Sequence, residues 1–211
     1  MPALTLAEKI DPAHAVLLVI DMQNDYIHPD GFLGKAGADT QPVIEIVPTL
    51  RSLLDTARAA GVHVIHTRNW HRPATDSPAW LDKLARLGQD QAHRPAIAGS
   101  WGAGWYGVEP LPGEEVINKF RYDAFLGTNL EFLLRARGAR TVVICGTATN
   151  VCVESTARAA HMRDFHLVMV GDACASVNVA AHDGTLANIA TNFGEIAGSA
   201  RVAEVWSRAR G

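Results

Sequence analysis

The sequence predicts an α/β fold in which a six-stranded, mainly parallel sheet lies between two layers of helices, a three-layer α/β/α arrangement. Short runs of branched apolar residues alternate with stretches of helical periodicity along the chain. The 211 residues are 48% hydrophobic and 19% charged, a composition typical of a globular protein with a sizeable core. No linker, repeat or low-complexity tract divides them, so we expect one domain over residues 1–211.

The N-terminal half predicts two strands, two helices and a long loop. Ala15–Ile20 is an apolar run with the length of a buried strand, and residues 42–60 carry apolar side chains at helical spacing. A second strand is expected at 62–66 and a short helix at 77–87. Residues 88–113 are rich in Gly, Pro and Trp and predict a long loop, which in compact domains is usually functional or disordered; its aromatic residues argue against disorder.

The C-terminal half repeats the alternation of strand and helix. We expect strands at 115–118, 140–145 and 165–170, helices at 129–137, 151–162 and 181–192, and a weak final strand at 200–205. Strands that alternate with helices in this way indicate βαβ units and a parallel sheet.

Composition argues against several classes of protein. A formal net charge of −3 gives no electrostatic reason to expect a nucleic acid or an anionic membrane as partner. We find no signal-peptide pattern near the N-terminus, and the apolar run Ala15–Ile20 is too short to span a membrane. Three cysteines form a sparse, odd set, which argues against a disulfide framework and favours a reducing cytoplasm.

Three reactive side chains follow three predicted strands. Asp21 comes directly after the first strand, Lys119 follows the third, and Cys152 lies shortly after the fourth at the start of a helix. Each has an ordinary structural explanation: a cap, a solvated lysine, and a core cysteine. Sites in open α/β sheets form beyond the carboxyl ends of strands, so their occurrence at one sheet edge favours a shared site.

The three side chains suit nucleophilic catalysis. A helix N-terminus and the Lys119 ammonium are expected to depress the pKa of the Cys152 thiol. Asp21 can take the thiol proton and return it to a leaving amine. Backbone N–H groups in residues 146–150 can bind an oxyanion, an effect worth ~3 kcal/mol per donor in other enzymes. We interpret Cys145 as a core residue and expect Cys174 in a loop without a role.

Three motifs resemble those of the isochorismatase-like cysteine hydrolases, and the resemblance covers nearly the whole chain. They are VIDMQNDY at 19–26, KFRYDAF at 119–125 and GTATNVCVESTARAA at 146–160. The resemblance implies an isochorismatase-like, Rossmann-like fold, a triad of Asp21, Lys119 and Cys152, and a thioester intermediate. It also implies a cis peptide between Thr147 and Ala148, which would aim the Ala148 N–H, with that of Cys152, at the oxyanion.

Within that family, the sequence favours an amidase without a metal. Members that cleave the vinyl ether of isochorismate lack the cysteine. Nicotinamidases bind a metal through an Asp-x-His pair and a further histidine; here Asn69 replaces the aspartate, His71 remains and the second histidine is missing. We therefore expect no metal and no other cofactor. The third motif is most similar to those of ureidoacrylate amidohydrolase, biuret hydrolase and N-carbamoylsarcosine amidase, whereas Asp123 departs from them and leaves the substrate open.

Candidate substrate-binding residues lie in the loops after strands and in the long insertion. Their side chains can either wall a small pocket or pack the loops onto the scaffold. These candidates are Gln23, Asn24, Phe32, Asn69, Trp70, Trp105, Tyr122 and Phe125. Arg68 or Arg121 can bind a substrate carboxylate or form a surface ion pair.

The leading hypothesis is a cysteine amidohydrolase whose substrate is a small amide or ureide. The alternatives are a vinyl ether hydrolase that uses Asp21 as its acid, and a non-catalytic oligomeric member of the family. Aromatic residues in the long loop favour a homodimer or a homotetramer.

Overall fold

A computed structural model describes residues 3–88 and 94–209 of the chain. Six strands form one sheet in the order β3-β2-β1-β4-β5-β6, and every pairing is parallel. The sheet order reverses between β1 and β4, which places a topological switch point beyond their carboxyl ends, where ligands bind in open α/β sheets. The strands are β1 (Ala15–Ile20), β2 (His63–Asn69), β3 (Glu115–Lys119), β4 (Thr141–Thr147), β5 (His166–Ala175) and β6 (Glu195–Ala197).

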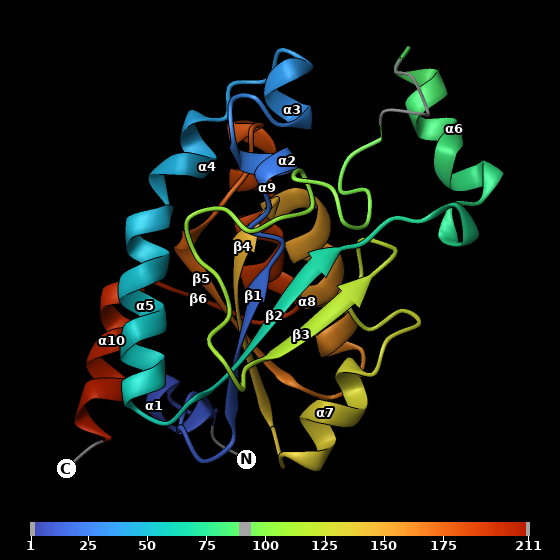
Figure 1. The fold of residues 1–211 in the computed structure, drawn as a ribbon. Coiled ribbons are helices and arrows are strands. Elements are labelled where there is room, and N and C mark those ends of the chain that lie inside the picture. Colours follow the sequence, from blue (N-terminus) through green and yellow to red (C-terminus); the bar gives the residue numbers. More distant parts are fainter. Residues whose placement is uncertain (1–2, 89–93, 210–211) are drawn as a thin grey trace.

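Helices cover both faces of the sheet, which confirms the three-layer prediction (Figure 1). α5 (Val47–Ala59) and α10 (Ser199–Arg208) pack side by side on one face, and α8 (Glu154–His161) and α9 (Val179–Asn192) pack against the other. The remaining helical elements are α1 (Leu6–Lys9), α2 (Asn24–Ile27), α3 (Phe32–Lys35), α4 (Gln41–Glu45), η1 (Pro73–Thr75), α6 (Pro78–Arg86), α7 (Leu130–Ala136) and η3 (Thr149–Val153).

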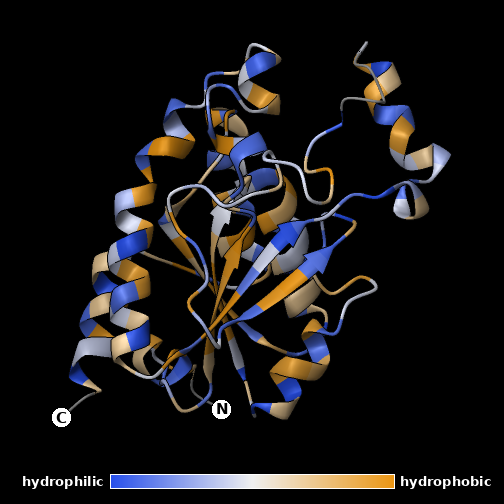
Figure 2. Cartoon of the chain, in the orientation of Figure 1, coloured by the Kyte–Doolittle hydropathy of each residue, from blue (hydrophilic) through white to orange (hydrophobic). Residues whose placement is uncertain are grey.

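The apolar pattern explains the central elements. All six residues of β1 are buried, as expected for a central parallel strand that is covered on both faces. In α5 the buried residues Leu50, Leu53, Leu54 and Ala57 follow helical spacing and face the sheet. Figure 2 shows apolar colour concentrated on the strands and on one side of the flanking helices. In the part of the chain that is described, no helix has the length and hydropathy needed to cross a membrane.

Two predictions about the C-terminal part were wrong. Residues 200–205 belong to helix α10, not to a strand, and the sixth strand lies earlier, at Glu195–Ala197. Val202 and Trp206, one helical turn apart, are both buried, and the Trp206 Nε1–H donates to the Ile10 carbonyl at 2.8 Å. Cys174, expected in a loop, lies in β5, because this strand continues to Ala175.

The described part of the long insertion is tied to the segment after β1. The backbone N–H groups of Asn24 and Asp25 donate to the carbonyls of Gly104 and Gly102, each at 2.9 Å. A short bridge also pairs Gln23 with Trp105. These contacts give residues 94–113 a defined path over the carboxyl edge of the sheet.

Candidate active site

The three predicted catalytic side chains converge at the carboxyl edge of the sheet. Asp21 is the first residue after β1, Lys119 ends β3, and Cys152 lies in η3 just beyond β4. The Lys119 Nζ lies 2.7 Å from the Asp21 Oδ2, and both side chains are fully buried. Cys152 is buried beside them, 6% exposed. The expected convergence of a sulfur, an ammonium and a carboxylate is therefore present in the fold.

Asp21 is held in an uncommon backbone conformation by neighbours on β2. Its φ is 49°, in the left-handed region that non-glycine residues seldom adopt. Its N–H donates to the Thr67 carbonyl at 3.1 Å, while the Thr67 hydroxyl donates to the Asp21 Oδ1 at 2.8 Å. Such local strain commonly occurs at functional sites, where the surroundings fix it in place.

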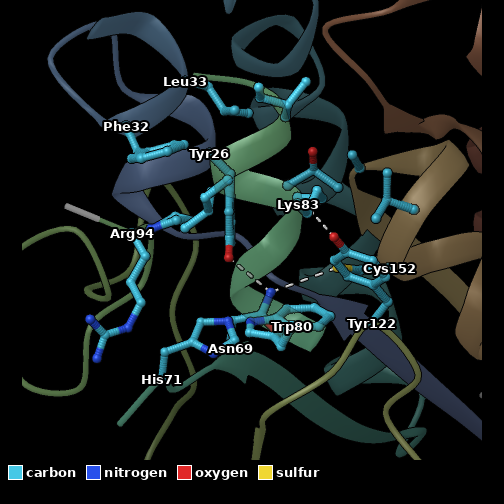
Figure 3. A pocket seen from close by; sticks show the side chains of 16 residues that line it. Tyr26, Phe32, Leu33, Asn69, His71, Trp80, Lys83, Arg94, Tyr122 and Cys152 are labelled. Atoms are coloured by element: carbon cyan, nitrogen blue, oxygen red, sulfur yellow. Dashed lines mark hydrogen bonds between the residues drawn. The ribbon is translucent and has the colours of Figure 1, made fainter. Parts of the chain in front are cut away.

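Asn69, at the end of β2, connects Asp21, Lys119 and Cys152. Its Oδ1 accepts a hydrogen bond from the Lys119 Nζ at 2.9 Å, and its Nδ2 donates to the Asp21 Oδ2 at 2.9 Å. The same Nδ2 donates to the Tyr26 hydroxyl at 2.9 Å and faces the Cys152 Sγ at 3.7 Å (Figure 3). An amide offers an acceptor and donors at once, so one side chain satisfies both a cation and an anion.

The Gln23 side chain fixes the backbone of Asn69 through two hydrogen bonds. The Asn69 N–H donates to the Gln23 Oε1 at 2.8 Å, and the Gln23 Nε2 donates to the Asn69 carbonyl at 3.0 Å. The Gln23 Nε2 also donates to the Ala103 carbonyl at 2.9 Å, which ties the long insertion to the same point. Gln23 thus supports the site through the backbone of Asn69.

Burial sets the protonation of the Cys152 thiol. It raises the pKa of the Cys152 thiol to about 12; Lys119 lowers that pKa, but Asp21 raises it further. The expectation of a depressed thiol pKa was therefore wrong, because desolvation outweighs the ammonium. Burial also lowers the pKa of Lys119, but attraction to Asp21 and Cys152 outweighs it, and the pKa lies above its ordinary value. The resting site holds a neutral thiol beside an ammonium.

The segment between β4 and Cys152 brings backbone groups to the site. Gly146 has a φ of 114°, and a Cβ there would lie 2.2 Å from the Ile20 carbonyl oxygen, so only glycine lets β4 pass this close to β1. The following peptide bond, Thr147–Ala148, is cis, as the resemblance implies. η3 then forms one π-helical turn that contains Cys152, a feature frequent at functional sites.

A cavity of about 200 Å³ opens above Cys152 (Figure 3). Its walls are mainly apolar and aromatic, as in most small-molecule sites. The lining residues are Tyr26, Phe32, Leu33, Asn69, His71, Trp80, Lys83, Leu84, Leu87, Arg94, Pro95, Tyr122, Thr147, Ala148, Val151 and Cys152.

The predicted substrate-binding residues divide into two groups. Phe32, Asn69 and Tyr122 line the cavity, together with Thr147 and Ala148. The described lining of the cavity does not include the other five, which are Gln23, Asn24, Trp70, Trp105 and Phe125. The structure gives these five residues packing contacts instead.

Asn24, Phe125 and Trp105 hold surrounding segments in place. The Asn24 Nδ2 donates to the Trp101 carbonyl at 2.8 Å, so it anchors the insertion. Phe125 packs in the core, its ring centroid 6.2 Å from that of Phe165. Trp105 meets the ring of His66 edge-on at 5.7 Å. These three side chains therefore hold loops and neighbouring segments on the scaffold, which is the alternative to lining a pocket.

The two arginines proposed for carboxylate binding also lie outside the cavity lining. The Arg68 guanidinium stacks over Trp70 at 3.9 Å and its Nε donates to the Asn118 Oδ1 at 2.7 Å. The Arg121 guanidinium lies 4.7 Å from the Trp80 ring centroid and donates to the Thr75 carbonyl at 2.9 Å. Both side chains are engaged in holding loops at the rim.

Several lining residues were not predicted from the sequence. Tyr26 lies within the first motif and its spacing from Asp21 could have indicated it. Trp80, Lys83 and Leu84 belong to α6, whose start is marked by the Ser77 cap, and helical spacing could have placed them on one face. Arg94 lies in the long insertion, where no sequence pattern could have indicated it.

The side chains of Asn69 and His71 do not suit a divalent metal ion. The Asn69 Oδ1 already accepts from the Lys119 ammonium, which is a cation itself. The His71 Nδ1 faces the Asp76 Oδ1 at 3.2 Å, and the ring stacks on Trp80 at 5.4 Å between centroids. Over residues 3–88 and 94–209, no group of three or more His, Cys, Asp or Glu side chains is arranged to hold a metal.

The parallel α/β/α fold and the buried Asp–Lys–Cys site are those of a cysteine hydrolase with a three-layer architecture. A model of the isochorismatase domain matches residues 15–201. The chain therefore belongs to the isochorismatase family.

Relatives and solved structures agree with this assignment. Ureidoacrylate amidohydrolase RutB of Methylobacterium radiotolerans is 35% identical over 92% of this chain and 80% of its own length. RutB of Caulobacter vibrioides is 34% identical over 95% of this chain and 94% of its own. A cysteine hydrolase from Pseudomonas syringae pv. phaseolicola is 27% identical with a TM-score of 0.86, over 99% of both chains. N-carbamoylsarcosine amidase of Thermoplasma acidophilum is 28% identical with a TM-score of 0.72, over 88% of this chain and 96% of that one.

Proposed function

We propose that this chain is a cysteine amidohydrolase that cleaves a C–N bond of a small ureide or amide through a thioester intermediate. The enzyme is a hydrolase that acts on carbon–nitrogen bonds other than peptide bonds. The observation that carries the proposal is the buried contact of Asp21 with Lys119, 2.7 Å apart, at the Cys152 end of an apolar cavity.

The first half of the reaction acylates the cysteine. The Cys152 Sγ attacks the carbonyl carbon of the substrate while Asp21 accepts the thiol proton. N–H groups of Ala148 and Cys152 bind the oxyanion of the tetrahedral intermediate. When the intermediate collapses, the C–N bond breaks, the proton on Asp21 passes to the departing nitrogen, and amine or ammonia leaves.

The second half releases the acid and restores the thiol. Water attacks the thioester carbonyl while Asp21 accepts a proton from it. The C–S bond then breaks, and Asp21 returns that proton to the Cys152 sulfur. The atoms balance, because one water is consumed and each proton that Asp21 accepts is given back.

A protonated resting thiol fits this assignment of Asp21 as the base. With a thiol pKa of about 12, little thiolate exists at neutral pH, so the nucleophile forms only as the proton is transferred. The Lys119 ammonium then stabilises the developing thiolate and keeps the Asp21 carboxylate aligned. Asn69 holds both groups in register through its amide.

Two kinds of relative support a ureide as substrate. RutB proteins are named for ureidoacrylate, and a structural neighbour is named for N-carbamoylsarcosine. Both names describe molecules with a ureido group, and an apolar cavity of about 200 Å³ suits a small molecule of this kind.

The test is ammonia release from ureidoacrylate, biuret, N-carbamoyl amino acids and nicotinamide, with isochorismate as the control for ether cleavage. We expect turnover of at least one ureide by the wild-type protein and a loss of at least 1,000-fold in the Cys152→Ala variant, as when a nucleophile is removed elsewhere. Undiminished ureide turnover by Cys152→Ala would refute the proposal.

We also infer that the enzyme works in the cytoplasm as a homo-oligomer. Three buried free thiols are compatible with a reducing compartment. Phe132 and Met162 are exposed by 72% and 76%, and such apolar side chains suit contacts with a second copy. Light scattering of the purified protein measures its mass in solution. A homo-oligomer predicts a mass of at least twice that of one chain.

A further inference from the structure

The mouth of the cavity carries a positive charge that the reaction described above does not use. Lys83 lies on α6 and lines the same cavity as Cys152 (Figure 3). Its Nζ donates to the Tyr122 hydroxyl and lies 5.1 Å from the centroid of the same ring. It also lies 5.9 Å from the Trp80 ring centroid. Two aromatic rings therefore hold the ammonium at the edge of the cavity.

The other described ionisable side chains that line the cavity are paired or neutral, and the Asp21–Lys119 pair beside Cys152 carries no net charge. Asp21 and Lys119 neutralise one another, and Cys152 is a neutral thiol. The Arg94 Nε pairs with the Asp76 Oδ2, and burial lowers the pKa of His71, which keeps its ring neutral at pH 7. None of the described side chains that line the cavity is an aspartate or a glutamate.

Lys83 differs from the other charged residues of its helix. Arg86 and Asp82, one turn apart on α6, form an ion pair at 2.8 Å. Among the residues that the structure describes, no carboxylate lies within ion-pair distance of the Lys83 Nζ. Its charge is available to a ligand, whereas that of Arg86 is engaged on the helix surface.

We propose that Lys83 binds a carboxylate at the far end of the substrate, so that the enzyme selects ureides or amides carrying an anionic tail. This inference rests on the proposed hydrolysis at Cys152 and adds the charge of the substrate. It assigns to Lys83 the role that sequence analysis offered to Arg68 or Arg121, whose guanidinium groups are engaged at the rim. Tyr122 positions the ammonium, since its hydroxyl accepts a hydrogen bond from the Nζ.

A carboxylate suits this place for two reasons. The apolar walls accept a short uncharged stem between the scissile carbonyl and the anion. Contacts with the Tyr122 and Trp80 rings restrict the exposed ammonium to the edge of the cavity, so less side-chain freedom is lost when it binds an anion. A contact at the far end of the substrate acts on the bound substrate and on the transition state alike, so it contributes to binding and is seen in KM.

The test compares one ureide with and without its charge. Steady-state kinetics are measured with ureidoacrylate and with its methyl ester, for the wild-type chain and for Lys83→Gln, Lys83→Arg and Arg86→Gln. We expect Lys83→Gln to raise KM for ureidoacrylate about tenfold, to leave kcat within about twofold, and to leave KM for the ester unchanged. Lys83→Arg should retain most of the affinity for ureidoacrylate. The control Arg86→Gln should leave KM unchanged for both substrates, because the Arg86 side chain lies outside the cavity lining.

Ionic strength gives a second signature. Added NaCl should raise KM for ureidoacrylate in the wild-type chain and have little effect in Lys83→Gln, because salt screens exposed charges. Equal changes of KM for acid and ester in Lys83→Gln, or no change for the acid, would overturn the inference.

Failure of this inference can be distinguished from failure of the proposed function. If the wild-type chain hydrolyses neither compound, binding of both to it is measured by titration calorimetry. Tighter binding of the acid than of the ester, lost in Lys83→Gln, supports the Lys83 subsite without hydrolysis. Equal binding of acid and ester, or no binding of either, overturns it.

Discussion

Replacing Lys119 with methionine removes the cation that neutralises the buried Asp21 carboxylate. The two groups are 2.7 Å apart and both fully buried. At an effective dielectric constant of about 20, two unit charges at this separation attract by about 6 kcal/mol. Part of that attraction offsets the cost of burying the charges, and breaking a buried pair by removing one partner costs about 3–5 kcal/mol of stability.

We therefore expect Lys119→Met to lower the free energy of unfolding by about 3–5 kcal/mol, or the Tm by about 10 °C for a chain of this size. The double variant Asp21→Asn/Lys119→Met removes both charges and should recover most of that loss. Urea unfolding followed by circular dichroism measures the free energy of unfolding of the wild-type chain, of Lys119→Met and Asp21→Asn alone, and of the double variant. A loss below about 1 kcal/mol in Lys119→Met, or a double variant less stable than either single one, would refute the reasoning.

Three further predictions follow from the geometry of the site. In Asn69→Asp a second carboxylate replaces the Asn69 amide, whose Nδ2 lies 2.9 Å from the Asp21 Oδ2. We therefore expect kcat/KM for a ureide to fall at least 100-fold at pH 7. The control Asn192→Asp, at the exposed end of α9, should change kcat/KM less than twofold. Gly146→Ala should lower the free energy of unfolding by more than about 3 kcal/mol, because its Cβ would lie 2.2 Å from the Ile20 carbonyl oxygen. Gly184→Ala on α9, where nothing lies within 4 Å of the added Cβ, should leave stability unchanged or raise it slightly. Similar losses of stability for the two variants in thermal unfolding would contradict this. Because burial raises the pKa of the Cys152 thiol to about 12, its alkylation by iodoacetamide should be slow at pH 7 and rise about tenfold per pH unit up to pH 10. A rate that levels off between about pH 9 and pH 10, seen by intact-mass spectrometry, would show that the thiol ionises at its ordinary pKa.

The reactive side chains could be predicted from the sequence because strand ends are marked by local pattern. The run Ala15–Ile20 is apolar throughout, so Asp21 directly after it must lie at the edge of the sheet. Parallel strands bring their carboxyl ends to the same edge, and this placed Lys119 and Cys152 beside Asp21. The family motifs then supplied the cis peptide and the order of the triad.

Features that depend on tertiary packing could not be predicted in this way. The role of Asn69 requires simultaneous contacts with Lys119 and Asp21, two segments that only the folded sheet brings together. The raised pKa of Cys152 reflects burial, which local pattern does not quantify. Residues 200–205 were interpreted as a strand because their weak apolar pattern did not distinguish a strand from the start of a helix that buries Trp206.

The mouth of the cavity was also beyond prediction, because it depends on where the long insertion and α6 lie relative to the sheet. Lys83 and Arg94 reach the cavity from segments without a family motif. Arg68 and Arg121 lie near the carboxyl ends of strands, and this position favoured them for binding a substrate carboxylate. In the structure, however, their guanidinium groups stack on Trp70 and Trp80.

The most direct test of the account is acid-quenched mass spectrometry of the wild-type chain during turnover of a ureide. The account predicts that the peptide containing Cys152 gains the mass of the acyl part of the substrate, and that this gain disappears when the substrate is exhausted. An acyl group on any other residue, with the Cys152 peptide unmodified throughout turnover, would contradict it.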